Sequence, residues 1–253
     1  AVLYGKSEGV LAGVPFFNMV FELVNCQVEW HKEEGFWMHP EPEKGKAGYA
    51  VLATVTGLAK DILMGERLAL NILANASGVA FKSARMKKIA DSQPDFKGKV
   101  AATRKITPGF RLVQKYSVLV GGCDAHRMDL SSMIMLKDNA IDSCGSITKA
   151  VQQARSLGFS LKIEVESRNL EEALEAAEAN ADVIMLDNFS PDDARAVSET
   201  IKSKYPHIMI EVSGGITEDT ASSYMGPHID ILSTSSLIQG VPVVDFSLKI
   251  QKQ

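Results

Sequence analysis

Charged and small polar residues follow six short apolar runs in the second part of the chain. The residues after the runs are Arg104-Lys105, Lys137-Asp138-Asn139, Glu166, Asp187-Asn188, Ser213-Gly214-Gly215 and Ser233-Thr234-Ser235-Ser236. Basic side chains bind carboxylate and phosphate groups, whereas carboxylates hold hydroxyls, bind Mg²⁺ or oppose a developing positive charge. One such ending is common by chance, but six in succession predict a site for an anionic small molecule.

The candidate anion-binding group consists of basic residues. They are Arg104, Lys105, His126, Arg127 and Lys137. The planar fork of a guanidinium matches the geometry of carboxylate and phosphate groups. His126 and Arg127 also follow a Gly121-Gly122 pair, and glycines allow the backbone to approach a ligand closely. The alternative interpretation is that these cations are solvated loop charges.

Glu166 and Asp187 form a separated pair of carboxylates. We expect them to hold sugar hydroxyls, to bind Mg²⁺ or to stabilise positive charge at a sugar carbon. On the sequence alone, an ion pair between each carboxylate and a neighbouring Lys or Arg is nearly as good an interpretation.

Two successive runs end in small polar residues that could hold a phosphate. The first group is Ser213, Gly214 and Gly215, and the second is Ser233, Thr234 and Ser235. Backbone N–H groups and hydroxyls next to helix starts bind phosphate, and many barrels place such groups on successive strands. For either group alone, a tight turn with a Ser cap is the alternative.

The elements that must position these residues are short strands that alternate with amphipathic helices. The expected strands span 99–103, 133–136, 161–165, 183–186, 208–212 and 229–232. Ser146, Asn169 and Ser190 are expected to cap the intervening helices. Buried strands alternating with helices predict a parallel α/β fold with right-handed crossovers. A barrel or near-barrel fits better than an open sheet because no GxGxxG fingerprint follows the first strand, and a barrel gathers the strand ends on one face.

The first part of the chain has a different pattern. Residues 48–58 predict a strand, residues 61–90 predict a long helix, and residues 40–46 are typical of a loop. Arg67 falls within the apolar stretch 63–73 of that helix. Because a buried Arg is costly unless it is paired, we expect Glu66 or a ligand of another subunit to satisfy it.

Composition excludes several classes of protein. The 253 residues carry 27 Lys and Arg against 31 Asp and Glu, a net charge of −4 that argues against a nucleic-acid partner. No apolar run approaches the roughly 18 residues of a membrane span, so no membrane partner is expected. Three cysteines without zinc-like or CxxC spacing favour a reducing compartment, and we expect a cytoplasmic protein.

A set of short motifs extends from about residue 5 to about residue 250. They are Gly9-Val10-Leu11-Ala12-Gly13, Glu66-Arg67-Leu68-Ala69-Leu70-Asn71, Thr103-Arg104-Lys105, Lys115-Tyr116, Gly121-Gly122, His126-Arg127-Met128-Asp129-Leu130, Lys137-Asp138-Asn139, Glu164-Val165-Glu166, Leu186-Asp187-Asn188-Phe189, Ser213-Gly214-Gly215-Ile216 and Asp245-Phe246-Ser247-Leu248. In this order they resemble the motifs of the quinolinate phosphoribosyltransferase family, whose members are also called carboxylating nicotinate-nucleotide pyrophosphorylases. The resemblance is to the fungal members in particular.

The resemblance implies an incomplete α/β barrel, TIM-like with parallel strands, plus a smaller N-terminal α/β sandwich domain. It places the sandwich domain at 1–67, joined by 241–253 returning from the C-terminus, and the catalytic barrel at 68–240. It implies transfer of phosphoribose from phosphoribosyl pyrophosphate to the ring nitrogen of quinolinate, with loss of the 2-carboxylate as CO₂. The product would be nicotinate mononucleotide, made by a pentosyltransferase of NAD biosynthesis.

The resemblance also implies roles for the residues that match its motifs. Arg104, His126, Arg127 and Lys137 would bind the two pyridine carboxylates. Lys105 and Lys137 would face the pyrophosphate.

Further roles concern the sugar, the phosphate and the assembly. Glu166 and Asp187 would hold the ribose hydroxyls, with Mg²⁺ bound near the pyrophosphate through substrate or water. Ser213, Gly214, Ser233 and Ser235 would hold the 5′-phosphate. Arg67 would enter the neighbouring subunit's site, which implies a homodimer at minimum and leaves a hexamer open.

Two positions depart from the family pattern. Ile106 stands after Lys105 where the family has Thr, and Ala140 stands after Asn139 where the family has His. Each departure removes a polar group beside the expected anion pocket. Tolerated drift is one interpretation; a diverged homologue that acts on another aromatic acid or has little catalytic activity is the alternative. A non-catalytic anion-binding protein is a third.

Overall fold

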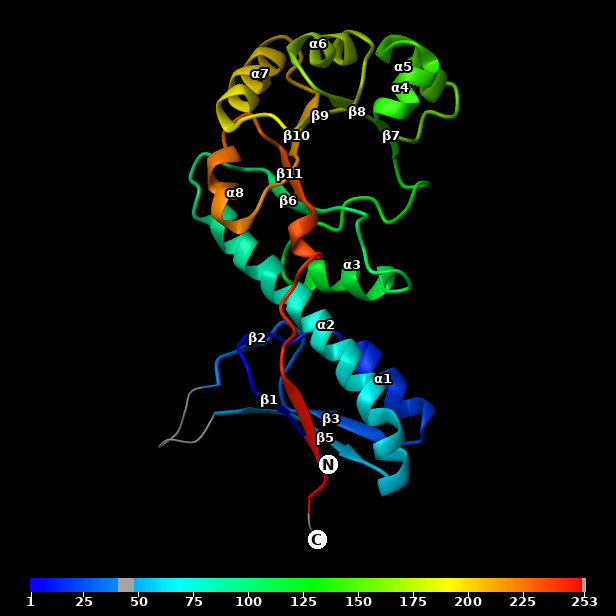
Figure 1. Cartoon of the computed structure of the whole chain (residues 1–253), viewed down its shortest axis with the longest axis vertical. Coiled ribbons are helices and arrows are strands. Elements are labelled where there is room, and N and C mark those ends of the chain that lie inside the picture. The colour runs from blue at the N-terminus through cyan, green and yellow to red at the C-terminus, as the bar shows by residue number, and fades with distance from the viewer. Residues whose placement is uncertain (41–47, 252–253) are drawn as a thin grey trace. The chain divides into compact units, whose positions relative to one another are not determined.

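The chain divides into two compact units in the computed structural model, which describes residues 1–40 and 48–251. The first unit comprises Ala1–Arg85, Ile106–Cys123 and Leu237–Gln253, and the second comprises Met86–Lys105 and Asp124–Ser236. Figure 1 traces the chain through both. The domain boundaries expected after residues 67 and 240 stay a prediction.

A four-stranded antiparallel sheet forms the base of the first unit, in the order β12-β1-β5-β3. Its strands are β1 (Val2–Gly5), β3 (Gln27–Trp30), β5 (Ala50–Thr56) and β12 (Phe246–Lys249). A separate pair consists of β2 (Gly9–Val10) and β4 (Trp37–Met38). Because β12 pairs with β1, the end of the chain completes the sheet that its first residues begin.

Three helices belong wholly or mainly to the first unit. They are α1 (Val14–Leu23), α2 (Ala59–Asp91) and α3 (Arg111–Val120). Phe17 and Phe21 of α1 and Leu73 of α2 are fully buried in one apolar cluster with Leu3 and Leu52 of the sheet. Although α2 is 33 residues long, none of the helices within residues 1–40 and 48–251 is long and apolar enough to cross a membrane.

Six parallel strands form the second unit, in the order β6-β11-β10-β9-β8-β7. They are β6 (Lys99–Ala102), β7 (Ile134–Leu136), β8 (Ile163–Ser167), β9 (Val183–Asp187), β10 (Met209–Ser213) and β11 (Ile231–Thr234). The first strand, β6, pairs with the last, β11, whereas in the described part of the chain no ladder joins β6 to β7. A sheet that returns to its first strand and leaves one gap is an incomplete barrel, which confirms the predicted fold class.

Helices cover the outer side of this sheet (Figure 1). They are α4 (Asp138–Cys144), α5 (Ile147–Arg155), α6 (Leu170–Glu178), α7 (Pro191–Lys204) and α8 (Glu218–Tyr224). Ser146, Asn169 and Ser190 begin α5, α6 and α7, and each side-chain oxygen accepts the N–H three residues on, at 3.2, 2.9 and 3.2 Å. The three predicted caps are therefore confirmed.

The expectation that Arg67 is buried is wrong. The stretch 63–73 does form part of α2, but Arg67 lies on its exposed side. Leu63 and Leu68 are also exposed there, by 58% and 57%, because only one stripe of a helix can face its core. Arg67 therefore needs no partner inside this chain. Apart from Pro40, the loop expected at 40–46 lies outside the described residues.

Candidate active site

A cavity of about 830 Å³ lies at the carboxyl ends of the six parallel strands. All of its lining residues belong to the second unit. They include Arg104, Lys105, His126, Arg127, Lys137, Glu166, Asp187, Ser213, Gly214, Gly215, Ser233, Thr234 and Ser235. The structure thus brings together every site residue predicted from the sequence except Arg67, which belongs to the first unit. Ala140 also lines the cavity, whereas Ile106 belongs to the first unit.

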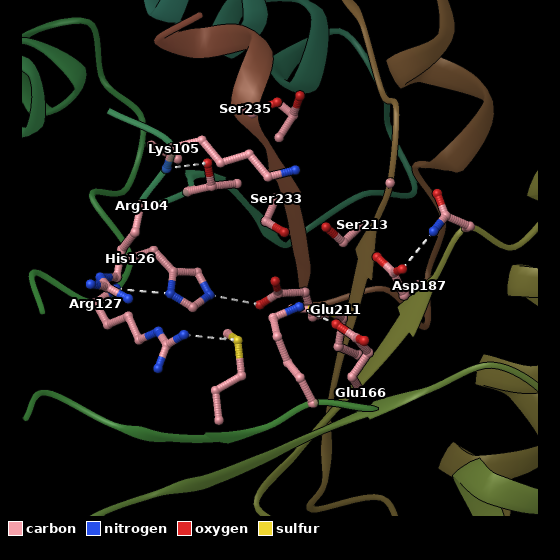
Figure 2. A pocket seen from close by; sticks show the side chains of 18 of the residues that line it. Arg104, Lys105, His126, Arg127, Glu166, Asp187, Glu211, Ser213, Ser233 and Ser235 are labelled. Atoms are coloured by element: carbon pink, nitrogen blue, oxygen red, sulfur yellow. Dashed lines mark hydrogen bonds and ion pairs between the residues drawn. The ribbon is translucent and has the colours of Figure 1, made fainter. Parts of the chain in front are cut away.

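Arg104 and Arg127 form the cationic side of the cavity, and His126 lies beside them (Figure 2). The Arg127 guanidinium donates to the Met133 carbonyl oxygen at 3.4 Å and to Met135 Sδ at 3.1 Å. Burial lowers the pKa of Arg127 from its ordinary value. Neither of these two partners carries a charge, and a guanidinium has five donors, so part of the fork remains for an anionic ligand.

His126 is held in an unusual backbone conformation. Its φ is 55°, in the left-handed region that residues other than glycine rarely adopt. The Asp124 carboxylate accepts the His126 backbone N–H at 2.7 Å, and His126 Nδ1 accepts the Arg127 backbone N–H at 2.8 Å. On the other side of the ring, Nε2 lies 2.9 Å from Glu211 Oε2. Both ring nitrogens therefore form hydrogen bonds with groups of the protein.

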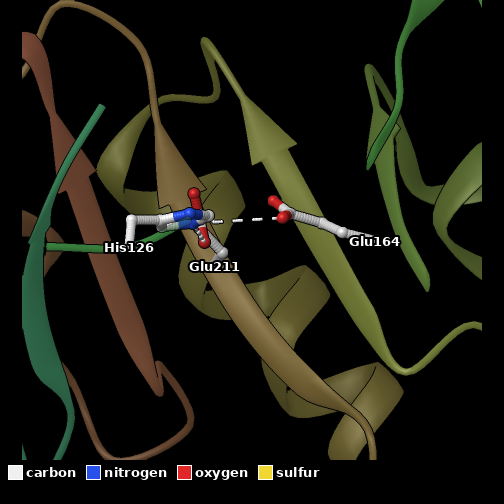
Figure 3. A group of neighbouring side chains, drawn as sticks. All are labelled: His126, Glu164 and Glu211. Carbon is white, nitrogen blue, oxygen red and sulfur yellow. Dashed lines mark hydrogen bonds and ion pairs between the residues drawn. The ribbon is translucent and has the colours of Figure 1, made fainter. Parts of the chain in front are cut away.

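Two buried carboxylates that sequence reasoning missed lie beside this histidine, Glu164 on β8 and Glu211 on β10 (Figure 3). Both residues are fully buried. Neither carboxylate oxygen of Glu164 has a hydrogen-bond partner within the described residues, and Glu164 Oε2 is 3.9 Å from His126 Nε2. Burial, together with the nearby Glu211 carboxylate, raises the pKa of Glu164 well above its usual range.

The alternation of a strand could have located both carboxylates. Side chains two residues apart point to the same face, so Glu164 shares a face with Glu166, and Glu211 shares a face with Ser213. In the sequence, 161–165 and 208–212 are typical of apolar runs, and only the residues at their ends are predicted to belong to the site. The charged residue inside each run is the signal that could have located these carboxylates.

His126, Glu164 and Glu211 place ligand-type atoms within 4.8 Å of one another, which is compatible in distance with a metal ion. A metal on Nε2 would need the lone pair of that nitrogen. Because Nδ1 already accepts the Arg127 N–H, the hydrogen bonds assign the ring proton to Nε2, where it is donated to Glu211. The arrangement favours a hydrogen-bonded histidine over a metal ligand.

The two predicted carboxylates have different partners. Glu166, at the end of β8, forms an ion pair with Lys137, as one interpretation of the sequence anticipated. Asp187, at the end of β9, accepts a hydrogen bond from the Asn188 side-chain amide. Within the described residues no Lys or Arg forms an ion pair with Asp187, so its negative charge is not compensated by a cation of this unit.

The small polar residues lie at the carboxyl ends of β10 and β11. Ser213 is the last residue of β10 and is followed by Gly214 and Gly215. Ser233 lies on β11, and Ser235 begins the short 3₁₀ helix that follows this strand (Figure 2). These residues all line the cavity and offer hydroxyls and backbone N–H groups to a phosphate.

Thr234, the last residue of β11, has a structural role. Its hydroxyl donates to the Ile216 carbonyl at 2.6 Å and accepts the Ser236 N–H at 3.0 Å. Thr234 therefore ties the loop after β11 to the loop after β10.

Gly214 is expected to tolerate alanine less well than its neighbour Gly215. Both have positive φ, 104° and 62°, so an alanine at either position costs about 1 kcal/mol of backbone strain. Only at Gly214 would the added Cβ overlap the Asn188 side chain; at Gly215 it would meet nothing within 4 Å. Thermal unfolding of Gly214→Ala and Gly215→Ala measures the difference. Equal melting temperatures would contradict the close approach.

Fold and site together define a class of protein: an α/β-barrel protein whose strand ends offer cations, carboxylates and small polar groups to a small anionic ligand. Family models for the N-terminal and C-terminal domains of quinolinate phosphoribosyl transferase match residues 1–77 and 79–249. The chain belongs to the quinolinate phosphoribosyltransferase family, and as a member it is a pentosyltransferase that acts on small molecules.

Individual relatives agree with the family models. The chain is 53% identical to a carboxylating nicotinate-nucleotide pyrophosphorylase of Dictyostelium discoideum, over 100% of this chain and 87% of that protein. It is 48% identical to the protein of that name from Rattus norvegicus, over 99% and 81%. The solved nicotinate-nucleotide pyrophosphorylase of Francisella tularensis superposes with a TM-score of 0.88 at 32% identity, covering 99% of this chain and 85% of that one.

Proposed function

We propose that this chain transfers the phosphoribosyl group of phosphoribosyl pyrophosphate to the ring nitrogen of quinolinate and releases the 2-carboxylate as CO₂. The products are nicotinate mononucleotide and pyrophosphate, and the reaction serves NAD biosynthesis. One observation carries the proposal: a single cavity joins a cationic side, two carboxylates and a pair of small polar loops. Family membership supports the same reaction.

Quinolinate, a dicarboxylate, binds at the cationic side. Arg104 and Arg127 offer guanidinium forks to its two carboxylates, and Lys137 adds an ammonium group. Lys105 extends into the cavity (Figure 2), and with Lys137 it faces the departing pyrophosphate. Two cations at the leaving group lower the cost of the charge that develops there.

Glu166 and Asp187 act on the ribose. As pyrophosphate leaves, positive charge develops at the sugar carbon that the ring nitrogen attacks. Carboxylates that hold the ribose hydroxyls stabilise this charge more strongly in the transition state than in the ground state, which is the condition for a faster chemical step. Asp187 contributes more than Glu166 to the stabilisation of this charge, because the Glu166 carboxylate is already paired with Lys137.

The carboxyl ends of β10 and β11, with the residues that follow each strand, hold the 5′-phosphate. The contacts come from the hydroxyls of Ser213, Ser233 and Ser235 and from backbone N–H groups at Gly214 and Gly215. This contact fixes the far end of the sugar. Fixing both ends of the donor holds the reacting carbon in line with the ring nitrogen, which removes much of the entropic cost of the transfer.

Decarboxylation follows from the first step. Once the new N–C bond makes the ring nitrogen positive, the bond between C2 and its carboxylate breaks, and the electron pair stays on C2 next to that charge. CO₂ leaves, and C2 takes up a proton. The protein's part is to hold the carboxylate in place while the ring supplies the electron sink.

We also propose that Mg²⁺ takes part. Mg²⁺ binds through one or two carboxylates, substrate phosphates and water, and the oxygens of Glu166 and Asp187 at the cavity wall fit that requirement. When bound, the ion would neutralise charge on the pyrophosphate.

The active assembly is proposed to be a homodimer at minimum, with Arg67 reaching the neighbouring subunit's site; the exposed position of Arg67 on α2 supports this. At quinolinate concentrations near the wild-type KM, Arg67→Ala and Arg127→Ala are each expected to be nearly inactive, because each removes a cation from every site. After subunit exchange, a mixture of the two regains activity, since one site of each mixed dimer keeps both arginines. No recovery in a mixture shown to contain mixed dimers would contradict a shared site.

Product formation tests the proposed function. The purified protein with Mg²⁺, phosphoribosyl pyrophosphate and quinolinate is expected to form nicotinate mononucleotide faster than about 0.1 per second, against roughly 1–1000 per second for typical enzymes. Mass spectrometry follows the product, and nicotinate, which lacks the 2-carboxylate, is the matched control acceptor. Absence of product from folded protein that binds phosphoribosyl pyrophosphate would overturn the proposal and turn attention to other ring acids, for which Ala140 in the cavity wall is the first position to examine.

A further inference from the structure

His126 links the barrel sheet to the backbone of Arg127. Its Nδ1 accepts the Arg127 N–H at 2.8 Å, and its Nε2 donates to Glu211 Oε2 at 2.9 Å. With the proton on Nε2 and the Nδ1 lone pair in use, neither nitrogen has a free hydrogen for a substrate carboxylate. In this arrangement both ring nitrogens form hydrogen bonds with groups of the protein and not with the ligand.

The turn at His126 needs such support. A left-handed conformation is strained in a residue other than glycine and persists only where its surroundings hold it. The Asp124 carboxylate and the ring nitrogen Nδ1 each accept one backbone N–H of the turn. Among the hydrogen bonds of the described residues, only the one from Nε2 to Glu211 links the ring to a strand of the sheet, β10.

We infer that Glu211 is a positioning residue for the proposed reaction. By accepting the Nε2 hydrogen it fixes the ring form whose Nδ1 holds the Arg127 backbone, and it thereby keeps the Arg127 guanidinium at the cavity wall for a substrate carboxylate. Loss of the acceptor lets the proton move to Nδ1. A protonated Nδ1 repels the Arg127 N–H, and the turn relaxes. The expected change in the KM for quinolinate rests on the proposed function, whereas the effect of Glu211 on the ring form of His126 does not.

Glu164 provides the matched control. It is a second buried carboxylate near the same nitrogen, but its Oε2 lies 3.9 Å from Nε2, and neither of its oxygens has a hydrogen-bond partner within the described residues. A general effect of a buried carboxyl group beside His126 would appear in variants of both residues. An effect that arises from loss of the hydrogen-bond acceptor would appear in variants of Glu211 and not in variants of Glu164.

The ring form is read directly by NMR of protein labelled with ¹⁵N-histidine. The chain has 5 histidines, so the signal lost in His126→Gln identifies His126. The wild-type protein is expected to show a protonated Nε2 and an unprotonated Nδ1. Glu211→Met shifts this pattern toward the other ring form, whereas Glu211→Gln, whose amide oxygen can accept the same hydrogen, restores it at least in part. Glu164→Gln keeps the wild-type pattern.

Steady-state kinetics provide the second measurement. Glu211→Met is expected to raise the KM for quinolinate by about 10- to 100-fold, because a small misplacement of a binding group can cost up to about 100-fold. The KM for phosphoribosyl pyrophosphate stays near its wild-type value, since its phosphate loops do not involve His126. The KM of Glu211→Gln for quinolinate is expected to lie closer to the wild-type value than the KM of Glu211→Met.

The inference is overturned if wild-type His126 carries its proton on Nδ1, or if Glu211→Met leaves both the ring form and the KM for quinolinate unchanged. Should Glu211→Met fail to fold, the wild-type spectrum and the Glu211→Gln variant still decide the ring form and its dependence on the acceptor. Absence of turnover in the wild-type protein would instead contradict the proposed function, while the spectra would continue to test the link from Glu211 to Arg127.

Discussion

Asp187→Asn is expected to lower kcat by about 100- to 1000-fold, the range found when one preorganised stabilising group is removed from a transition state. The substitution keeps the size of the side chain, removes the charge and replaces one acceptor oxygen by an NH₂ donor. Because no Lys or Arg in the described part of the chain forms an ion pair with Asp187, that charge is available to the ribose. Glu166→Gln is expected to lower kcat less, since Lys137 already compensates its carboxylate.

The measurement for Asp187→Asn is the initial rate of nicotinate mononucleotide formation at saturating substrates. Asp192→Asn is the matched control, because Asp192 is an exposed acid on α7 whose ion pair with Arg195 lies on the surface. The control should keep the wild-type rate. A kcat for Asp187→Asn within a few-fold of the wild-type value would show that Asp187 does not stabilise the sugar cation.

Arg127→Ala is expected to raise the KM for quinolinate by about 100-fold, the cost of losing a charge-assisted hydrogen bond to a carboxylate. The guanidinium is held at the cavity wall by the Met133 carbonyl and Met135 Sδ, neither of which neutralises it. The KM for phosphoribosyl pyrophosphate should change much less, because that substrate is held by the loops after β10 and β11. The effect should also exceed that of Glu211→Met, which displaces Arg127 without removing it.

Initial rates over a range of quinolinate concentrations test this expectation. Arg168→Ala is the matched control, since Arg168 is an exposed arginine that forms an ion pair with Glu172 within the α6 region and does not line the cavity. If both arginine variants kept the wild-type KM, the cationic side of the cavity would not be the quinolinate site.

Much of the barrel could be predicted because its signals are local. Each strand of the barrel contains a short, mainly apolar run, and each of the three predicted caps is a Ser or Asn directly before an amphipathic stretch. Ser146, Asn169 and Ser190 therefore begin their helices where expected. The convergence of the site also followed from the strand ends, because the carboxyl ends of parallel strands open on the same face.

The rest depended on contacts that no local pattern encodes. The pairing of β1 with β12 joins residues nearly the whole chain apart. Glu164 and Glu211 come together only because the strand register places their side chains on the inner face of the barrel, and an apolar run hides each of them in the sequence. For Arg67, apolar neighbours suggested burial, but only one stripe of α2 faces the core.

The central claim is that this one cavity couples phosphoribosyl transfer to decarboxylation of quinolinate. Its most direct test is a stoichiometry measurement with quinolinate labelled with ¹³C at the 2-carboxylate. The account predicts equal amounts of nicotinate mononucleotide, pyrophosphate and labelled CO₂, all lost together in Asp187→Asn. Labelled carbon retained in a phosphoribosylated product, or pyrophosphate released without nicotinate mononucleotide, would contradict it.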